Sequence, residues 1–311
     1  MGVVSAEFKF GGDIVVKTRV LISTGIMLML FARASQCHGI EESNQEVSIR
    51  TMPPVKYLWY GFDLLDIGRF AEKGKLGVEL STIMVSKNMW QGFDLLDDHG
   101  AFIPVGTVTF GDSGFSGKII GVYPLSSGFE KSVELDYAAF YTKAFLEDTR
   151  YVTNVTANYF YYGKPKQPGH NGDTQEVGVC LCWPKAFTIA DSPLVPSYYA
   201  GALWSSESNS DVRGVEGFVH VLGLAYDLGV TNFWPNGQKQ VFRFSGDITY
   251  NDGFGGKEVD HDWSHTVIGV STNLEMGNLT MTPSVNYQIS MDDSVNDEDE
   301  LWCGVNVTYR F

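Results

Sequence analysis

The chain has 311 residues, and no apolar run approaches the roughly 20 residues of a transmembrane helix. Its formal net charge is −15 without any basic stripe, which argues against nucleic acid as a partner. Apolar residues make up 44% of the chain and are spread by alternation rather than gathered in blocks. This composition suits a β-rich protein, whether soluble or embedded in a membrane.

The first segment, residues 1–34, has the pattern of an export signal. Lys17 and Arg19 precede an apolar stretch over residues 20–32, and an A-x-A cleavage site follows at 32–34. The residues before Lys17 make either an over-long n-region or a misplaced start codon. We therefore predict a cleaved signal peptide.

Residues 35–74 form a predicted periplasmic or plug-like extension that contains half of an internal repeat. WYGFDLLD at 59–66 recurs as WQGFDLLD at 90–97, with seven of eight positions identical. The repeat is open to three interpretations: a duplicated strand end, a plug or an interfacial helix. The K-x-x-W-x-G-F sequence at 87–93 resembles the first strand of a group of uncharacterised Gram-negative outer-membrane proteins. That group usually has Arg where this chain has Gln91.

From about residue 75 onwards, apolar and polar residues alternate with period 2, which predicts β-strands rather than helices. The alternation is strict over 278–291 and less clean over 101–124. The first strand loses parity near 81–83, where a bulge is one explanation. The twelve predicted strands are 76–92, 101–111, 114–124, 132–146, 150–162, 175–188, 195–205, 215–228, 239–251, 263–275, 278–291 and 300–311.

The predicted connections alternate between short and long along the chain. Outer-membrane barrels have short periplasmic turns and longer outer loops, whereas a soluble sandwich has no reason to show this alternation. The predicted periplasmic connections fall near 112–113, 147–149, 190–194, 230–238 and 275–278, and all of them are short except 230–238. The long ones fall near 94–100, 125–131, 163–174, 206–214, 252–262 and 293–299.

The last predicted strand has one apolar face, which ends in Tyr309 and Phe311, and one polar or small face. The pattern resembles the C-terminal closing strand of bacterial outer-membrane β-barrels, whose terminal Phe is recognised by the barrel-assembly machinery. The resemblance implies that Tyr309 and Phe311 are the assembly signal. It also implies surroundings of outer-membrane lipid and lipopolysaccharide in a Gram-negative cell.

We therefore predict an all-β fold, a transmembrane antiparallel up-and-down β-barrel of about 12 strands over residues 75–311. The alternative is a soluble secreted β-sandwich or lectin-like domain. Strand parity predicts which side chains face lipid: Phe244, Val285, Tyr287, Val307, Tyr309 and Phe311. The predicted lumen-lining residues are Glu134, Asp136, Arg243, Asp247, Asn286, Gln288, Asn306 and Arg310.

These lining residues allow two interpretations. They can select small solutes by charge and hydrogen bonding, or they can simply fill a narrow barrel. We predict a passive, porin-like channel for small solutes. The alternative is a non-conducting barrel with a structural or adhesive role, and a rim hydrolase acting on lipid is third.

The remaining reactive residues predict neither catalysis nor a metal or cofactor. Cys180 and Cys182 lie on one face of one strand, as two small lumen fillers rather than a metal pair, and Cys303 faces lipid. Ser264 and His265 are adjacent, so a regular strand would point them to opposite faces, and no acyl-hydrolase motif surrounds them. The acidic run over 292–300 is expected to be a solvated outer loop rather than a cation site.

Overall fold

The computed structural model describes residues 2–10, 14–22, 58–59, 62–63, 75–167, 172–190, 192–206, 215–231, 233 and 239–311. The chain divides into two units, Met1–Arg50 and Thr51–Phe311. In the first unit, β1 (Gly2–Phe10) pairs antiparallel with β2 (Ile14–Ile22). The predicted cleavage site at 32–34 lies outside the described residues.

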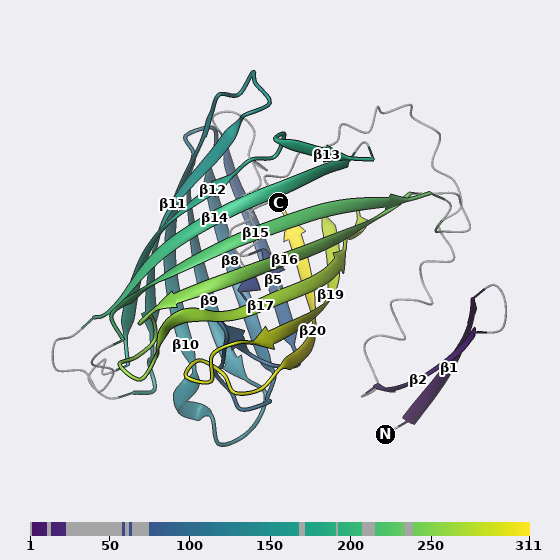
Figure 1. Ribbon diagram of the computed structural model, residues 1–311, viewed down its shortest axis with the longest axis horizontal. Helices are drawn as coiled ribbons and strands as arrows, with labels where there is room; N and C mark the ends of the chain where they lie inside the picture. The colour runs from purple at the N-terminus through teal and green to yellow at the C-terminus, as the bar shows by residue number, and fades with distance from the viewer. Residues whose placement is uncertain are drawn as a thin grey trace. The chain divides into compact units, whose positions relative to one another are not determined.

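Twelve strands of the second unit, counted over its described residues, close into an antiparallel barrel whose tilted walls are visible in Figure 1. Each strand pairs with the next along the chain, and the last pairs with the first, so the up-and-down prediction is confirmed. The strands are β5 (Leu76–Val85), β8 (Ala101–Phe110), β9 (Phe115–Pro124), β10 (Glu134–Phe145), β11 (Thr153–Gly163), β12 (Thr174–Cys182), β14 (Ser192–Ser205), β15 (Gly217–Val230), β16 (Gln240–Asp252), β17 (His261–Thr272), β19 (Leu279–Ser290) and β20 (Glu300–Arg310).

Shorter strands are not part of this ring. β13 (Phe187–Ile189) pairs with β14, and β18 (Leu274–Met276) pairs with β19. Two hairpins of two-residue strands pair β3 (Leu58–Trp59) with β4 (Phe62–Asp63) and β6 (Met89–Trp90) with β7 (Phe93–Asp94). The described part of the chain contains one 3-10 turn, Glu130–Ser132, and no helix there is capable of crossing a membrane.

The seam between β5 and β20 closes the barrel. Its register runs without a shift from Glu79, opposite Arg310, to Val85, opposite Gly304. The Nε atom of Arg310 donates to Oε2 of Glu79 at 2.8 Å, which adds a charged pair to the backbone ladder. Because both terminal strands are paired, the ring has no open edge.

The outer surface of the barrel is apolar. Ile268 is 51% exposed and Val285 is 52% exposed, and many other large apolar side chains also point outwards. Such a continuous apolar exterior is costly in water, but it is the surface that a transmembrane barrel presents to lipid. The soluble sandwich alternative is therefore wrong, and the chain is an outer-membrane-type β-barrel.

Two details of the predicted first strand are wrong. β5 ends at Val85, not at residue 92, because the chain leaves the wall there and enters a separate hairpin. β5 pairs with β8 and β20 without a register shift, so there is no bulge near 81–83. The parity was hard to follow because Ile83 and Val85, which are apolar, point inwards.

Candidate functional site in the barrel lumen

The connection between β5 and β8, residues 86–100, folds into the lumen, and we call it the lumen loop. It contains the second copy of the repeat, 90–97, whose first residues form the β6–β7 hairpin. Both copies therefore contain short strands, and the interfacial-helix interpretation is wrong for the described residues of each copy.

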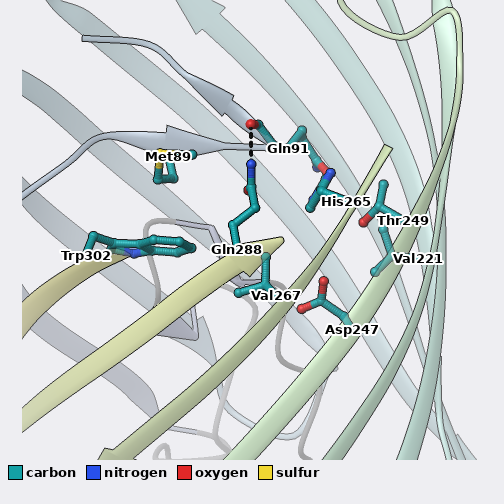
Figure 2. A pocket seen from close by; sticks show the side chains of 10 residues that line it. Met89, Gln91, Val221, Asp247, Thr249, His265, Val267, Gln288 and Trp302 are labelled. Carbon is teal, nitrogen blue, oxygen red and sulfur yellow. Dashed lines mark hydrogen bonds between the residues drawn. The ribbon is translucent and has the colours of Figure 1, made fainter. Parts of the chain in front are cut away.

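Contacts on opposite sides of the barrel show that the lumen loop crosses it. Nε2 of Gln288 in β19 donates to the Gly92 carbonyl oxygen at 2.8 Å, the dashed line in Figure 2. The ring centroids of Trp90 and Tyr162, which belongs to β11, are 5.8 Å apart with the rings edge to face. β11 and β19 lie opposite each other in the ring order, so the loop spans the lumen.

The sequence of the lumen loop explains its shape. Gly92 has a φ of +93°, and a Cβ there would lie 2.4 Å from Nδ1 of His265, so only glycine fits. The carboxylate of Asp94 accepts hydrogen bonds from the backbone N–H groups of Leu96, at 3.1 Å, and Asp98, at 2.6 Å. This local turn carries the Leu96 side chain into full burial.

An ion pair fixes the lumen loop to the barrel wall. The ammonium of Lys87 contacts the carboxylates of Glu300, at the start of β20, and Asp98 within the loop. Partial burial acts to lower the pKa of Lys87, but the hydrogen bonds and charges of the two carboxylates outweigh it. The net effect raises the pKa of Lys87 above its ordinary value, so the ammonium stays charged.

A cavity of about 20 Å³ remains beside the loop, which is space for about one or two water molecules. The side-chain N–H groups of Gln91 and Trp302, both buried, have no hydrogen-bond partner among the described residues. The cavity is therefore polar enough to hold water. Its lining residues, drawn in Figure 2, are Met89, Gln91, Gly92, Val221, Asp247, Thr249, His265, Val267, Gln288 and Trp302.

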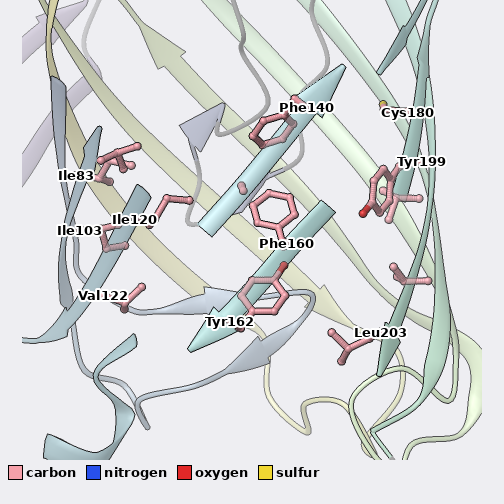
Figure 3. Close-up of a cluster of buried hydrophobic side chains, with 14 of the residues drawn as sticks. Ile83, Ile103, Ile120, Val122, Phe140, Phe160, Tyr162, Cys180, Tyr199 and Leu203 are labelled. Atoms are coloured by element: carbon pink, nitrogen blue, oxygen red, sulfur yellow. The ribbon is translucent and has the colours of Figure 1, made fainter. Parts of the chain in front are cut away.

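One side of the lumen is packed like a protein core. We call the inward faces of β5, β8, β9, β10 and β11 the apolar wall. Figure 3 shows Phe140 and Phe160 projecting into the barrel, and their rings meet edge to face at 5.4 Å. Ile83, Ile103 and Ile120 are at most 1% exposed. The polar inner wall that the sequence predicted is therefore incomplete.

The other side of the lumen, the polar wall, consists of the inward faces of β16, β17, β19 and β20. The eight predicted lumen-lining residues lie on buried or half-buried faces of their strands, two in β10 and six on the polar wall. Glu134, Asp136, Asn286 and Gln288 are buried, and Arg243, Asp247, Asn306 and Arg310 are half-buried. The predicted lipid-facing residues are all half-buried or exposed: Phe244, Val285, Tyr287, Val307, Tyr309 and Phe311.

Most of the charged side chains that face the lumen are acidic. Arg243 binds both carboxylate oxygens of Asp227, at 2.5 and 2.6 Å, rather than Asp247 on its own strand. Among the described residues, Asp247 has no cationic partner. The inward carboxylates are those of Glu79, Glu134, Asp136, Glu176, Asp227, Asp247 and Glu300, and the inward strand cations are Lys118, Arg243 and Arg310.

Ser264 and His265 do not point to opposite faces, so that expectation is wrong. The register of β16 and β17 shifts between Thr249 and Tyr250, and this bulge buries both residues. Oγ of Ser264 lies 2.9 Å from Nδ1 of His265 and donates to the Thr249 carbonyl oxygen at 3.3 Å. Ser264 is 0% exposed, so its hydroxyl is not accessible to a lipid substrate in this structure.

The other reactive groups lie as follows. Cys180 and Cys182 are buried on the inward face of β12, Cys303 is exposed on the outer face of β20, and all three are thiols. In the acidic run, Asp299 accepts hydrogen bonds from the hydroxyl of Tyr287 and the backbone N–H of Ser290. These bonds lower the pKa of Asp299.

Several lumen residues escaped the sequence-based prediction. Asp227 and Glu79 form ion pairs with Arg243 and Arg310, two of the predicted lumen residues. They were missed because the alternation of apolar and polar residues is less regular in their own strands. Gln91 and Trp302 line the cavity, and Gln91 does so only because its loop turns inwards. One signal was available: the apolar repeat at 90–97 stands out in an outer loop that should otherwise be polar.

Comparison with known proteins yields only distant matches. No family model matches the chain, and no curated protein matches it. Solved structures similar in fold include the NanC porin (10% identity, TM-score 0.44, 75% of this chain and 100% of that one) and the KdgM porin (8%, 0.45, 75% and 99%). An outer membrane channel from Pseudomonas putida F1 is similar as well (10%, 0.42, 78% and 98%). Function must be inferred from the residues of this barrel.

Proposed function

We propose that the protein is a passive outer-membrane channel for small solutes, with a preference for cations. The observation that carries this proposal is the polar wall, which lines the lumen beside the lumen loop with hydrogen-bonding groups. Asp247 contributes a carboxylate to the cavity there without a cationic partner among the described residues. Carboxylates in a constriction concentrate cations and repel anions.

Recording from planar bilayers under a KCl gradient tests this proposal. The reversal potential of the wild-type protein should indicate cation preference, and Asp247→Asn should shift it towards zero. Cys303→Ser on the lipid face is the matched control and should leave the potential unchanged. Anion preference in the wild-type protein, or no shift in Asp247→Asn, would contradict the proposal.

A non-conducting barrel is the second candidate, and the lumen loop favours it. The loop spans the lumen and leaves a cavity of only about 20 Å³. If the barrel is structural or adhesive, bilayers should stay silent even when heat-modifiable migration on gels shows a folded barrel. Conductance that appears only when residues 89–94 are replaced by a Gly-Ser linker would identify the loop as the block.

We also propose that the chain reaches the Gram-negative outer membrane by export and assembly. The export pattern at 1–34 supports a cleaved signal peptide, so N-terminal sequencing of the mature protein should begin at Ser35. The rings of Tyr309 and Phe311, both exposed on the lipid side, support recognition by the barrel-assembly machinery. Phe311→Ala should lower the yield of folded barrel in cells, whereas Phe187→Ala in β13 should not.

A further inference from the structure

A second outer connection, residues 253–260 between β16 and β17, also turns into the lumen, and we call it the β16–β17 loop. It begins with a turn in which the φ values of Gly253 and Gly255 are +75° and +105°, a conformation that suits glycine. Asn251, which is 0% exposed, holds this turn. Its Nδ2 donates to the Phe254 carbonyl oxygen at 3.0 Å, and its Oδ1 accepts from the Phe254 N–H at 2.7 Å. The turn thereby carries the Phe254 side chain into full burial.

The lumen loop and the β16–β17 loop contact each other through aromatic rings. The ring centroids of Trp90 and Phe254 are 5.3 Å apart. The ring of Phe93 lies against Gly255, where an added Cβ would come within 2.7 Å of its Cζ atom. We call this contact between Trp90, Phe93, Phe254 and Gly255 the clasp. Because the two loops leave the wall from different strands, β5 and β16, only the tertiary structure brings them together.

The clasp belongs to an apolar cluster that fills the outer end of the lumen. The ring of Trp90 packs edge to face against Tyr162 in β11. Leu96 of the lumen loop is 0% exposed and lies in the same buried cluster as Phe254 and Val219. An apolar constriction excludes the water that ions carry with them, so hydrated ions do not cross such a cluster. The two loops therefore close the lumen at its outer end while both remain in place.

The lumen loop is held by two kinds of contact that differ in how they respond to its release. Its polar ties to the wall are the hydrogen bond from Gln288 to the Gly92 carbonyl and the Lys87 ion pair, and water can replace the partners in both. The clasp offers no such exchange, because the departure of one loop exposes to water the rings that it covered on the other. Release of either loop thus removes packing that holds the other loop in the lumen.

We propose that the lumen loop and the β16–β17 loop form a two-part lid at the outer end of the lumen, and that the clasp couples them so that release of one loop releases the other. The lid stands over the cavity that contains Asp247, so its effect on ion flow rests on the proposed channel function. The coupling itself is a property of the folded barrel and can be measured whether or not the protein conducts.

Hydrogen exchange of the folded barrel measures the coupling directly. Phe254→Ala should accelerate exchange at the backbone amides of 89–96 on the order of tenfold, because the lumen loop loses its packing partner. Trp90→Ala should in return accelerate exchange at the amides of 254–259, which belong to the other loop. Phe244→Ala, on the outer face of β16, is the matched control and should change neither segment.

Milder changes of the same contact keep this test decisive if an alanine variant does not fold. Phe93→Ala removes a half-buried ring of the clasp, and Phe254→Leu keeps an apolar side chain but removes the aromatic contact. Either one replaces a variant that fails to give a heat-modifiable, folded barrel. The proposal is overturned if each folded variant accelerates exchange only in its own loop.

Recording from planar bilayers tests the consequence for ion flow. Phe254→Ala and Trp90→Ala should each raise the open probability, and the double variant should raise it no further than the stronger single variant, because either change already releases the lid. The reversal potential should stay that of the wild-type protein, since Asp247 is unchanged. In a conducting protein, an unchanged open probability or fully additive increases would overturn the lid. Silent recordings from every variant, together with reciprocal hydrogen exchange, would instead overturn the channel function and support the coupled loops.

Discussion

The apolar wall and the polar wall face each other across one lumen, but they differ in the side chains that they turn inwards. On the polar wall, Asn286 and Gln288 alternate with Val285 and Tyr287, so the inner and outer faces differ in chemistry. On the apolar wall the large inward side chains are mostly apolar and pack against one another, although Lys118, Glu134 and Asp136 are buried there too. The lumen loop contacts both walls, with Trp90 on one and the Gly92 carbonyl on the other. One side of this lumen is thus packed largely like a protein core, whereas the polar wall is lined mainly by hydrogen-bonding groups.

Truncating a side chain of the apolar wall should give the largest effect. Phe140→Ala removes a 2% exposed ring that packs on Phe160, and should cost about 3–5 kcal/mol of unfolding free energy. Asn286→Ala on the polar wall is the matched variant and should cost about 1 kcal/mol. Urea unfolding in lipid vesicles measures both, and equal costs would mean that the two walls are packed alike.

A charge on the outer face should give the second-largest loss of unfolding free energy, and it tests which side chains of β19 face lipid. Val285→Arg places a charge against lipid and should cost about 2–4 kcal/mol. Thr282→Arg, on the inward face of the same strand, should cost much less because the guanidinium can reach the lumen. The reverse order, measured by the same unfolding assay, would show that the inner and outer faces had been exchanged.

Removing the hydrogen bond between β19 and the lumen loop should have a smaller, local effect. Gln288→Ala leaves the Gly92 carbonyl without its donor and should cost about 0.5–1.5 kcal/mol. Hydrogen exchange should accelerate at the amides of 89–94 and not across the barrel strands. Gln175→Ala in β12, whose side chain bonds Tyr159 and Ser206, is the control and should leave those amides unchanged. If Gln175→Ala accelerated exchange at 89–94 equally, the Gln288 hydrogen bond would have no specific role in holding the loop.

The Lys87 ion pair should contribute least, and its pH dependence has a definite sign. Because the pKa of Lys87 is raised in the folded state, its contribution is fully present below the ordinary lysine pKa of about 10.4. It is lost only as the pH rises through the higher folded-state pKa. Lys87→Met should cost up to about 1 kcal/mol, measured between pH 7 and 9. A contribution that disappears within that range would contradict the raised pKa.

The fold was predictable because backbone chemistry leaves few choices in a membrane. A closed antiparallel barrel satisfies every backbone group, and the alternation of turn lengths revealed the strand count. The predicted limits of β8 and β9 agree with the structure to within one residue. The predicted limits of β5 do not agree with the structure. The alternation of apolar and polar residues is lost there because apolar side chains of this strand also face the interior of the barrel, not because the strand is irregular.

The site was less predictable, because its features depend on tertiary contacts. The bulge beside Thr249 places Ser264 and His265 on one side, and no local pattern signals it. The inward fold of the lumen loop depends on partners in β11 and β19, more than 60 residues further along the chain. The sequence could suggest that 90–97 is unusual for an outer loop, but not where it would lie.

The closing seam has a consequence for how the barrel is made. β5 and β20 lie at opposite ends of the barrel sequence, so their ladder joins residues far apart in the chain, and the Arg310–Glu79 pair joins residues separated by 231 positions. Contacts of such long range form late, and until this one forms the sheet presents two unpaired edges. A partly inserted sheet would expose those edges to hydrocarbon, where unpaired backbone groups are costly. Insertion and closure must therefore be nearly a single event, and a chain that stopped short of β20 would have no stable place in the bilayer.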